Sequence, residues 1–145
     1  MKFRNAKKED IPHMFTIIQK NWPKYPKTLA RKELEEMFST ALIKPTYIVA
    51  EEHKEIVAFA GFSPSWRDNL IFNMFWINVH PEHKGKEIGS KLITAVIDNI
   101  QNIKNPQAKL ILISTEMPSF YKKFGFRKKG PAYDKKYVVM SLRLR

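Results

Sequence analysis

The most informative stretch of the chain reads Val79-His80-Pro81-Glu82-His83-Lys84-Gly85-Lys86-Glu87-Ile88-Gly89-Ser90-Lys91-Leu92. It joins an apolar run at residues 70–79 to residues 88–103, whose apolar side chains recur at helical spacing. The stretch therefore predicts a loop leading into a helix N-terminus, where unpaired backbone N–H groups and the helix dipole favour an anion. Gly85 and Gly89 would let the backbone approach a phosphate closely. An ordinary strand–helix turn would use the same glycines, so the loop alone leaves both interpretations open.

The loop differs from two well-known phosphate-binding motifs. A Walker loop places Gly-Lys-Ser/Thr after a glycine and four further residues, whereas Gly85 is followed by Gly89-Ser90-Lys91. A dinucleotide-binding fingerprint needs three glycines near the start of its fold, and this loop has two glycines in mid-chain.

Strands and helices are expected along the whole chain. The expected strands are residues 2–5, 46–51, 56–62, 70–79 and 109–115, with two more within 126–144, and the expected helices are 11–22, 28–41, 88–103 and 118–124. Asp10 and Thr28 are the expected N-caps of the first two helices. The strand–helix–strand unit in the middle needs a right-handed crossover, which makes its two strands parallel. We therefore expect one α/β (α+β) domain over residues 1–145, with a central mixed sheet of about seven strands and about four helices on both faces.

Composition narrows the classes of protein. The chain has 145 residues, enough for one domain, and 43% of them are hydrophobic, enough for a packed core. The absence of cysteine excludes disulfides, cysteine-ligated zinc, iron–sulfur clusters and a cysteine nucleophile. The first ten residues lack the apolar stretch of a signal peptide, and the run at 70–79 is too short to span a bilayer. We expect a cytoplasmic protein without a membrane partner.

Positive charge is concentrated near the C-terminus. The formal net charge is +12, and residues 121–145 hold nine basic residues against one acidic residue. Such a segment suits nucleic acid, an acidic substrate or a phosphorylated cofactor, but composition alone favours a lysine-rich surface that only keeps the protein in solution.

A second motif, Ser119-Phe120-Tyr121-Lys122-Lys123-Phe124-Gly125-Phe126, follows the second strand of the parallel pair. Because parallel strands end at the same edge of a sheet, we expect Tyr121 to face the end of the 70–79 strand, where open α/β sheets bind ligands. Taken alone, a tyrosine such as Tyr121 is more often a core or rim aromatic.

With both motifs present, the sequence resembles the GNAT superfamily of acetyl-CoA-dependent N-acetyltransferases. Ile77-Asn78-Val79, His80-Pro81 and Lys84-Gly85-Lys86-Glu87-Ile88-Gly89 resemble the family's acetyl-CoA motif, and Phe120-Tyr121-Lys122-Lys123-Phe124-Gly125-Phe126 resembles its second motif. The opening Phe3-Arg4-Asn5-Ala6 with Glu9-Asp10-Ile11 is similar to the family's first strand and helix. The resemblance covers essentially the whole chain. It implies a GNAT-like fold and an acyltransferase that moves an acetyl group from acetyl-CoA to a primary amine by direct attack.

The resemblance implies acetyl-CoA as the acetyl donor and no metal. The implied donor-binding residues are Ile77, Asn78, Val79, Lys84, Gly85, Lys86, Glu87, Ile88, Gly89 and Ser90. Among these, the backbone of Ile77 and Val79 would bind pantetheine, and the loop would bind the pyrophosphate. The family's loop usually begins with Gln or Arg, where this chain has Lys84, and it has glycine where this chain has Glu87. Lys84 keeps the positive charge of an arginine but lacks the planar guanidinium that donates two parallel hydrogen bonds. Glu87 leaves the backbone free to bind if its side chain points to solvent, and it repels phosphate if it points inward.

Tyr121 matches the family's general acid, which would protonate the CoA thiolate. The sequence does not identify the general base that would deprotonate the acceptor amine. Some family members carry a glutamate where this chain has Asn73, which cannot act as a base. Glu116 is the first candidate, with capping of the following short helix as its alternative role. His80 and His83 flank the phosphate loop, and we interpret them as surface or phosphate-adjacent residues. A chain of waters without a single base would also serve.

The expected acceptor is a small-molecule or peptide amine. Its expected binding residues are Trp22, Tyr25, Asn73 and Tyr133, with ordinary packing as the alternative for the aromatic residues. A group of cations near the last strands would disfavour a polyamine and favour an acceptor that carries a carboxylate or phosphate. These cations are Arg127, Lys128, Lys129, Lys135 and Lys136.

Two other functions compete with the enzyme. A basic nucleic-acid-binding module would need basic and aromatic residues interleaved on one sheet face, whereas the cations cluster after Tyr121, so we do not expect a nucleic-acid partner. Glu87 and Asn73 would also suit a family member that binds acyl-CoA without catalysis. No apolar stripe identifies an interface, which leaves a monomer and a homodimer open.

Overall fold

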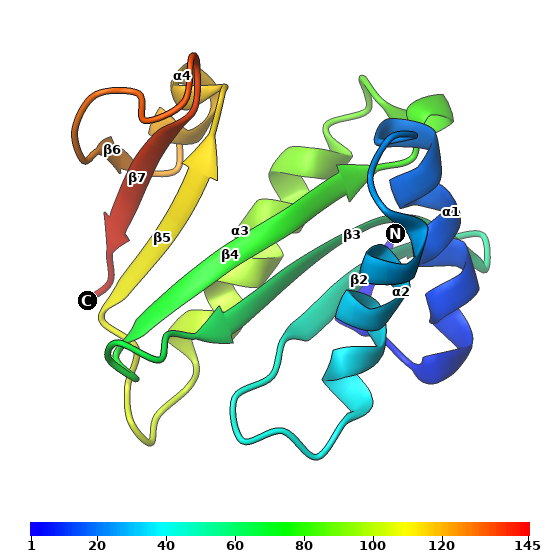
Figure 1. The fold of residues 1–145 in the computed structure, drawn as a ribbon, viewed down its shortest axis with the longest axis horizontal. Coiled ribbons are helices and arrows are strands. Elements are labelled where there is room, and N and C mark those ends of the chain that lie inside the picture. Colours follow the sequence, from blue (N-terminus) through cyan, green and yellow to red (C-terminus); the bar gives the residue numbers. More distant parts are fainter.

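The computed structural model describes all 145 residues, whose strands form one sheet in the order β1-β2-β3-β4-β5-β7-β6 (Figure 1). The strands are β1 Lys2–Asn5, β2 Thr46–Glu52, β3 Glu55–Pro64, β4 Ile71–Val79, β5 Leu110–Thr115, β6 Arg127–Lys128 and β7 Val138–Arg143. Neighbouring strands are antiparallel except β4 and β5, which are parallel. The predicted mixed sheet of about seven strands, with its central parallel pair, is therefore confirmed.

Four α-helices surround the sheet: α1 Ile11–Asn21, α2 Lys27–Glu35, α3 Ile88–Gln101 and α4 Pro118–Lys122. Short 3-10 helices add Lys8–Asp10, Glu36–Phe38 and Pro81–His83. In Figure 1, α1 and α2 lie over the β2–β3 half of one face, and α3 lies behind the opposite face. None of the helices combines the length and the apolar character that crossing a bilayer would require.

The core has two parts, one on each face of the sheet. Alternate residues of β2 point to opposite faces, so Ile48 and Ala50 pack with the residues of α3, and Tyr47 and Val49 pack with those of α1 and α2. A strand that is buried on both faces cannot alternate apolar with polar residues. This explains why the central strands read as continuous apolar runs.

The parallel pair separates soon after it forms. β4 and β5 pair only where Ile71–Asn73 meet Leu110–Leu112, and the two strands then diverge (Figure 1). Trp76 has a left-handed backbone with φ of 50°, and the register of β4 with β3 shifts at the same level. This is a β-bulge, which bends a strand locally. The β4 edge beyond Asn73 therefore has no strand partner on the β5 side.

A glycine on β3 accommodates the aromatic residues around the bulge. A Cβ atom at Gly61 would lie 2.7 Å from ring carbons of both Phe75 and Tyr47. Any side chain there would displace one of these rings, so glycine is required by close packing rather than by its backbone angles.

Three expectations about the first two helices were wrong. Asp10 precedes α1, but its side chain does not cap that helix. It accepts hydrogen bonds from the Lys7 backbone N–H and from Arg4, both at 2.7 Å, because the guanidinium on β1 competes for the carboxylate. The second helix begins at Lys27 rather than after Thr28, because the fixed φ of Pro26 already suits helix entry. It also ends at Glu35, where a 3-10 turn follows.

Candidate functional site at the β4–β5 opening

The loop between β4 and α3 presents a run of unpaired backbone donors. The first hydrogen bond of α3 runs from the Lys91 N–H to the Glu87 carbonyl at 3.2 Å. None of the backbone N–H groups from Lys84 through Ser90 donates to another backbone group of the protein. Consecutive free N–H groups beside a helix N-terminus form a concavity that suits a phosphate.

The backbone angles of this loop explain Gly85 and bear on Glu87, the residue that stands where the family's pattern has glycine. Gly85 has φ of 85°, and Glu87 has φ of 61°, a left-handed conformation that favours glycine. A Cβ atom at Gly89 would meet only Val79 Cγ2 at 3.7 Å, so the protein's own packing leaves space there for a ligand. The Glu87 side chain is exposed and has no ion-pair partner. Its carboxylate therefore does not block the free N–H groups.

Lys123 connects the two sequence motifs, and sequence reasoning missed this role. Its ammonium donates to Ser90 Oγ at 2.9 Å and lies 4.3 Å from the Phe120 ring centroid. This places a cation from the segment after α4 at the first turn of α3, beside the unpaired N–H groups. The adjacent lysines in the second motif were the available signal, but sequence alone does not show which one reaches the loop.

Tyr121 lies on α4, directly after β5, with only 6% of its surface exposed. Its ring packs edge-on against Phe120 and Phe126. Burial raises the pKa of the Tyr121 hydroxyl to about 12, so the phenol stays protonated at neutral pH. Its burial among aromatic rings also fits the role of a core aromatic residue.

The end of β4 is fastened to the end of α1. Asn78 is 3% exposed, and its Oδ1 accepts from Asn21 Nδ2 and Trp22 Nε1, both at 3.0 Å. Asn21 Nδ2 also donates to the Val79 carbonyl at 3.0 Å. The Asn78 carbonyl oxygen therefore holds α1 and Trp22, whereas its Nδ2 is buried without a hydrogen-bond partner.

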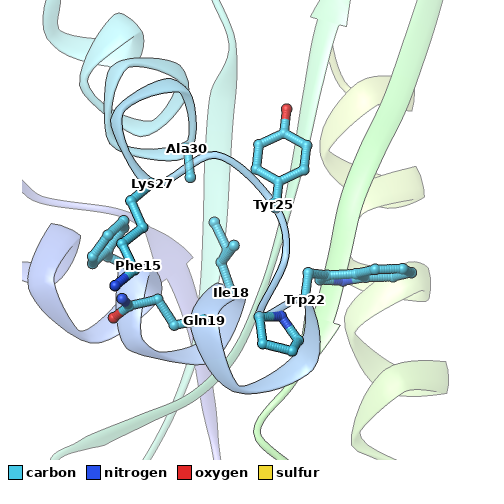
Figure 2. A pocket seen from close by; sticks show the side chains of 8 residues that line it. Phe15, Ile18, Gln19, Trp22, Tyr25, Lys27 and Ala30 are labelled. Carbon is cyan, nitrogen blue, oxygen red and sulfur yellow. The ribbon is translucent and has the colours of Figure 1, made fainter.

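Trp22 and Tyr25 follow α1 and line a cavity of about 200 Å³. Its other lining residues are Phe15, Ile18, Gln19, Pro23, Lys27 and Ala30. Figure 2 shows Trp22 and Tyr25 on the side of the cavity nearest β4, with Phe15, Gln19 and Lys27 on the opposite side. Trp22 is 46% exposed although its indole N–H is anchored, so it offers a fixed aromatic surface beside the end of β4.

A carboxylate on α2 reaches the bulge of β4, which sequence reasoning also missed. Glu33 accepts from Tyr25 Oη at 2.6 Å and from Trp76 Nε1 at 3.3 Å. Burial, with the help of Glu33, raises the pKa of Tyr25 to about 12. Glu33 shares a helix face with Ala30 and Met37, which was the only signal that it turns toward the protein.

A cavity of about 380 Å³ lies where β4 and β5 separate. It is lined by Asn73, Met74, Phe75, Trp76, Leu112, Ile113, Ser114 and Val139. Asn73 is thus part of the opening between the two strands, as an acceptor-site residue would be. The face of β4 that carries Asn73 and Phe75 is only half-buried, whereas Phe72 and Met74 on the opposite face are buried.

The remaining candidates lie on the β5–β7 side. Glu116 follows β5 and pairs with Lys136 at 2.8 Å, which raises the pKa of that lysine. Tyr133 is exposed on the segment between β6 and β7, with its ring 6.5 Å from that of Tyr137. No group of three or more His, Asp or Glu side chains is arranged to hold a metal ion.

Comparisons with known proteins agree with this geometry. The family described as "Acetyltransferase (GNAT) domain" matches residues 44–128, more than half of the chain. No curated protein sequence is similar enough to count as a match.

Solved structures share the fold at low sequence identity. A proposed GNAT acetyltransferase from Desulfovibrio desulfuricans has a TM-score of 0.80 at 17% identity, over 98% of both chains. A ribosomal-protein-alanine N-acetyltransferase from Brucella melitensis has a TM-score of 0.78 at 15% identity, over 99% of this chain and 100% of that one. An aminoglycoside 6'-N-acetyltransferase complexed with coenzyme A has a TM-score of 0.78 at 14% identity, over 99% and 97%. The family match and the fold together show that the chain belongs to the GNAT acetyltransferase family.

Proposed function

We propose that this protein transfers an acetyl group from acetyl-CoA to a primary amine by direct attack. The observation that carries the proposal is the run of free N–H groups from Lys84 to Ser90, which follows the end of β4, the strand that separates from β5 beyond Asn73. If the phosphates of a long donor bind to the loop N–H groups, the rest of the donor would extend along the opening between β4 and β5. Neighbouring structures solved with coenzyme A support a donor of this kind.

Donor binding would use both backbone and cations. The loop N–H groups would hold the pyrophosphate, with the cations Lys84, Lys86 and Lys123 close by. The edge of β4 from Ile77 to Val79 has no strand partner on the β5 side and would bind pantetheine through backbone groups beside the Val79 carbonyl, which already accepts from Asn21 Nδ2. Gly89, which has no side chain, would let the phosphate approach the first turn of α3.

The chemistry moves three protons: one leaves the acceptor ammonium before the attack, a second leaves the same nitrogen for solvent after the attack, and one reaches the departing thiolate. The neutral amine attacks the thioester carbonyl, so a C–N bond forms and the C–S bond breaks. An alkylammonium has a pKa of about 10.4, so the acceptor must first lose a proton. Glu116 is the proposed base. Its carboxylate must first break the ion pair with Lys136 and then contact the acceptor ammonium. Tyr121 donates a proton to the departing thiolate and regains one from solvent.

Two linked measurements test the proposal. Acetyl-CoA at about 100 times its Kd should add about 2.7 kcal/mol of stability, which a thermal melt detects. A thiol-release assay over a panel of amines and peptides should then show release that depends on an amine. Stabilisation without amine-dependent release would replace the proposal with non-catalytic acyl-CoA binding, and no stabilisation at all would reject both.

A further inference from the structure

One face of the sheet is only partly covered. α1 and α2 lie over the β2–β3 half and reach β4 at Trp76, whereas the same face of β5 and β7 carries no helix (Figure 1). Leu112 and Val139 are half-buried on this face, and Ser114 is exposed. Directly paired residues share a face, so Asn73, Leu112, Ser141 and Arg127 form one row across β4, β5, β7 and β6.

A basic cavity lies at the β6 end of that row. Its volume is about 600 Å³, and its lining residues are Leu110, Gly125, Arg127, Lys129, Ser141, Leu142 and Arg143. The three cations among them, Arg127, Lys129 and Arg143, make no ion pair, and the lining contains no carboxylate. Positive charge in a concave site without a counter-charge attracts an anion.

Ser141 provides a second observation at the same place. Only 5% of its surface is exposed, and its side chain shares the face of Arg127 and Leu112. Its hydroxyl lines the cavity and forms no hydrogen bond with another protein group. The hydroxyl oxygen is not one of the fully buried polar atoms that lack a partner, so it remains accessible from the cavity to a bound ligand.

Only some of the cations near the last strands that the sequence analysis named line this cavity. Arg127 and Lys129 line the cavity, and Arg143 joins them from β7. Lys136 is already paired with Glu116. Lys128 pairs in register with the buried Met140, so its side chain starts from the opposite face of the sheet.

We propose that this cavity binds the carboxylate or phosphate group of the acceptor. The proposal rests on the proposed acetyl transfer, which places the acceptor amine at the opening beside Asn73. Arginine suits such anions because its planar fork donates two parallel hydrogen bonds. Three strand spacings separate β4 from β6, about 14 Å, which an extended peptide spans with about four residues. The acceptor class is therefore an elongated amine with an anionic group, and polyamines are disfavoured.

Matched peptides test this inference. We would use amidated peptides with a free N-terminal amine and one glutamate at each position from the second to the sixth, each paired with its glutamine counterpart. A phosphoserine series distinguishes phosphate from carboxylate. Binding is measured by calorimetry in the presence of CoA, and acetylation is measured separately by thiol release with acetyl-CoA. The proteins are the wild type, the double variant Arg127→Gln/Arg143→Gln, and Lys20→Gln as a control on an exposed lysine of α1.

We expect the anionic peptides to bind the wild type and Lys20→Gln at least about tenfold more tightly than the glutamine peptides when the anion lies near the fourth residue. The double variant should lose this preference. Equal binding of acidic and neutral peptides, no binding of either, or a preference that survives in the double variant would overturn the inference. So would binding of single-stranded RNA that the double variant loses while peptides show no preference. Thiol release without an acid preference would leave acetyl transfer standing, whereas an acid preference without thiol release would reject acetyl transfer alone.

Discussion

Glu87 shows how one residue can affect both folding and donor binding. Its φ of 61° places an L-residue in the left-handed region, which costs about 1–2 kcal/mol relative to glycine. Its carboxylate stands at the end of the loop that carries the free N–H groups. The geometry leaves those groups open, but a negative charge remains near the expected phosphates.

Replacing Glu87 separates these two effects. Glu87→Gly removes both the backbone strain and the charge, and Glu87→Gln removes only the charge. We expect CoA to bind both variants about three- to tenfold more tightly than the wild type, measured by calorimetry at low salt. Only Glu87→Gly should also gain thermal stability. Unchanged or weaker CoA binding in both variants would show that the Glu87 carboxylate does not face the phosphates.

Tyr121 allows a cleaner separation of catalysis from folding. Its hydroxyl has no hydrogen-bond partner in the protein, so Tyr121→Phe should leave the melting temperature nearly unchanged. If the phenol protonates the leaving thiolate, kcat should fall by roughly 10²–10⁴-fold. A variant with full kcat would assign Tyr121 to the core alone.

The pH profile gives an independent test of the same residue. Because burial raises the pKa of Tyr121 to about 12, the phenol keeps its proton throughout the neutral and mildly alkaline range. We expect kcat to rise with pH as the acceptor amine loses its proton, with no descending limb below about pH 10 in stopped-time assays. A descending limb near neutral pH that Tyr121→Phe abolishes would contradict this assignment of the proton donor.

At the scale of elements, the opening between β4 and β5 depends on the bulge at Trp76. The left-handed backbone of a bulky residue is strained, and neighbouring elements must hold it in place. Glu33 on α2 accepts the indole N–H, and the Tyr25 ring packs edge-on against the indole at 4.8 Å. Helix α2 and the segment before it therefore help to shape the opening, although they lie outside the two sequence motifs.

Removing the Glu33 charge should test this support. In Glu33→Gln one amide N–H group would face the donors that the carboxylate now accepts, so we expect a loss of about 1–3 kcal/mol in the free energy of unfolding by urea. Tryptophan fluorescence should change as the indole of Trp76 loses its partner. The control is Glu35→Gln, an exposed residue of the same helix, which should stay within about 0.5 kcal/mol of the wild type. Equal stability of both variants would remove Glu33 from the support of the bulge.

Across the whole molecule, tyrosines with raised pKa values should limit stability at high pH. Burial raises the pKa of Tyr47, with a contribution from Glu33, and burial raises that of Tyr121 to about 12. An unfolded tyrosine loses its proton near pH 10, and the folded protein keeps it. Each such group therefore contributes stability below pH 10 that is lost as the pH rises through its folded pKa, by up to about 1.4 kcal/mol per pH unit.

Urea unfolding at a series of pH values from about 9 to 12 should show this loss. Tyr47→Phe should be less stable at neutral pH, because it loses the hydrogen bond to the Glu33 carbonyl, but its stability should fall less steeply above pH 10. Identical slopes for the variant and the wild type would show that Tyr47 does not titrate in the unfolding reaction.

Much of this architecture could be predicted from the sequence, because it rests on patterns within single elements. Continuous apolar runs predicted the buried strands, and the crossover rule predicted the parallel pair of β4 and β5. Asp10 was mispredicted as a helix cap because its partner, Arg4, reaches it from a different element. The contact between Glu33 and Trp76 joins residues 43 positions apart, so no local pattern could reveal it. The free N–H groups were predicted from the loop, whereas Lys123 beside them was not.

The most direct test of the central claim is to follow the acetyl group itself. The protein would be incubated with acetyl-CoA labelled in the acetyl group and with a panel of primary amines, and the products would be analysed by mass spectrometry. We predict a labelled N-acetyl amine formed in equal amount to free CoA, with the same product formed far more slowly by Tyr121→Phe. Free CoA and labelled acetate without any labelled amine, or no turnover with any amine although acetyl-CoA binds, would contradict acetyl transfer at the β4–β5 opening.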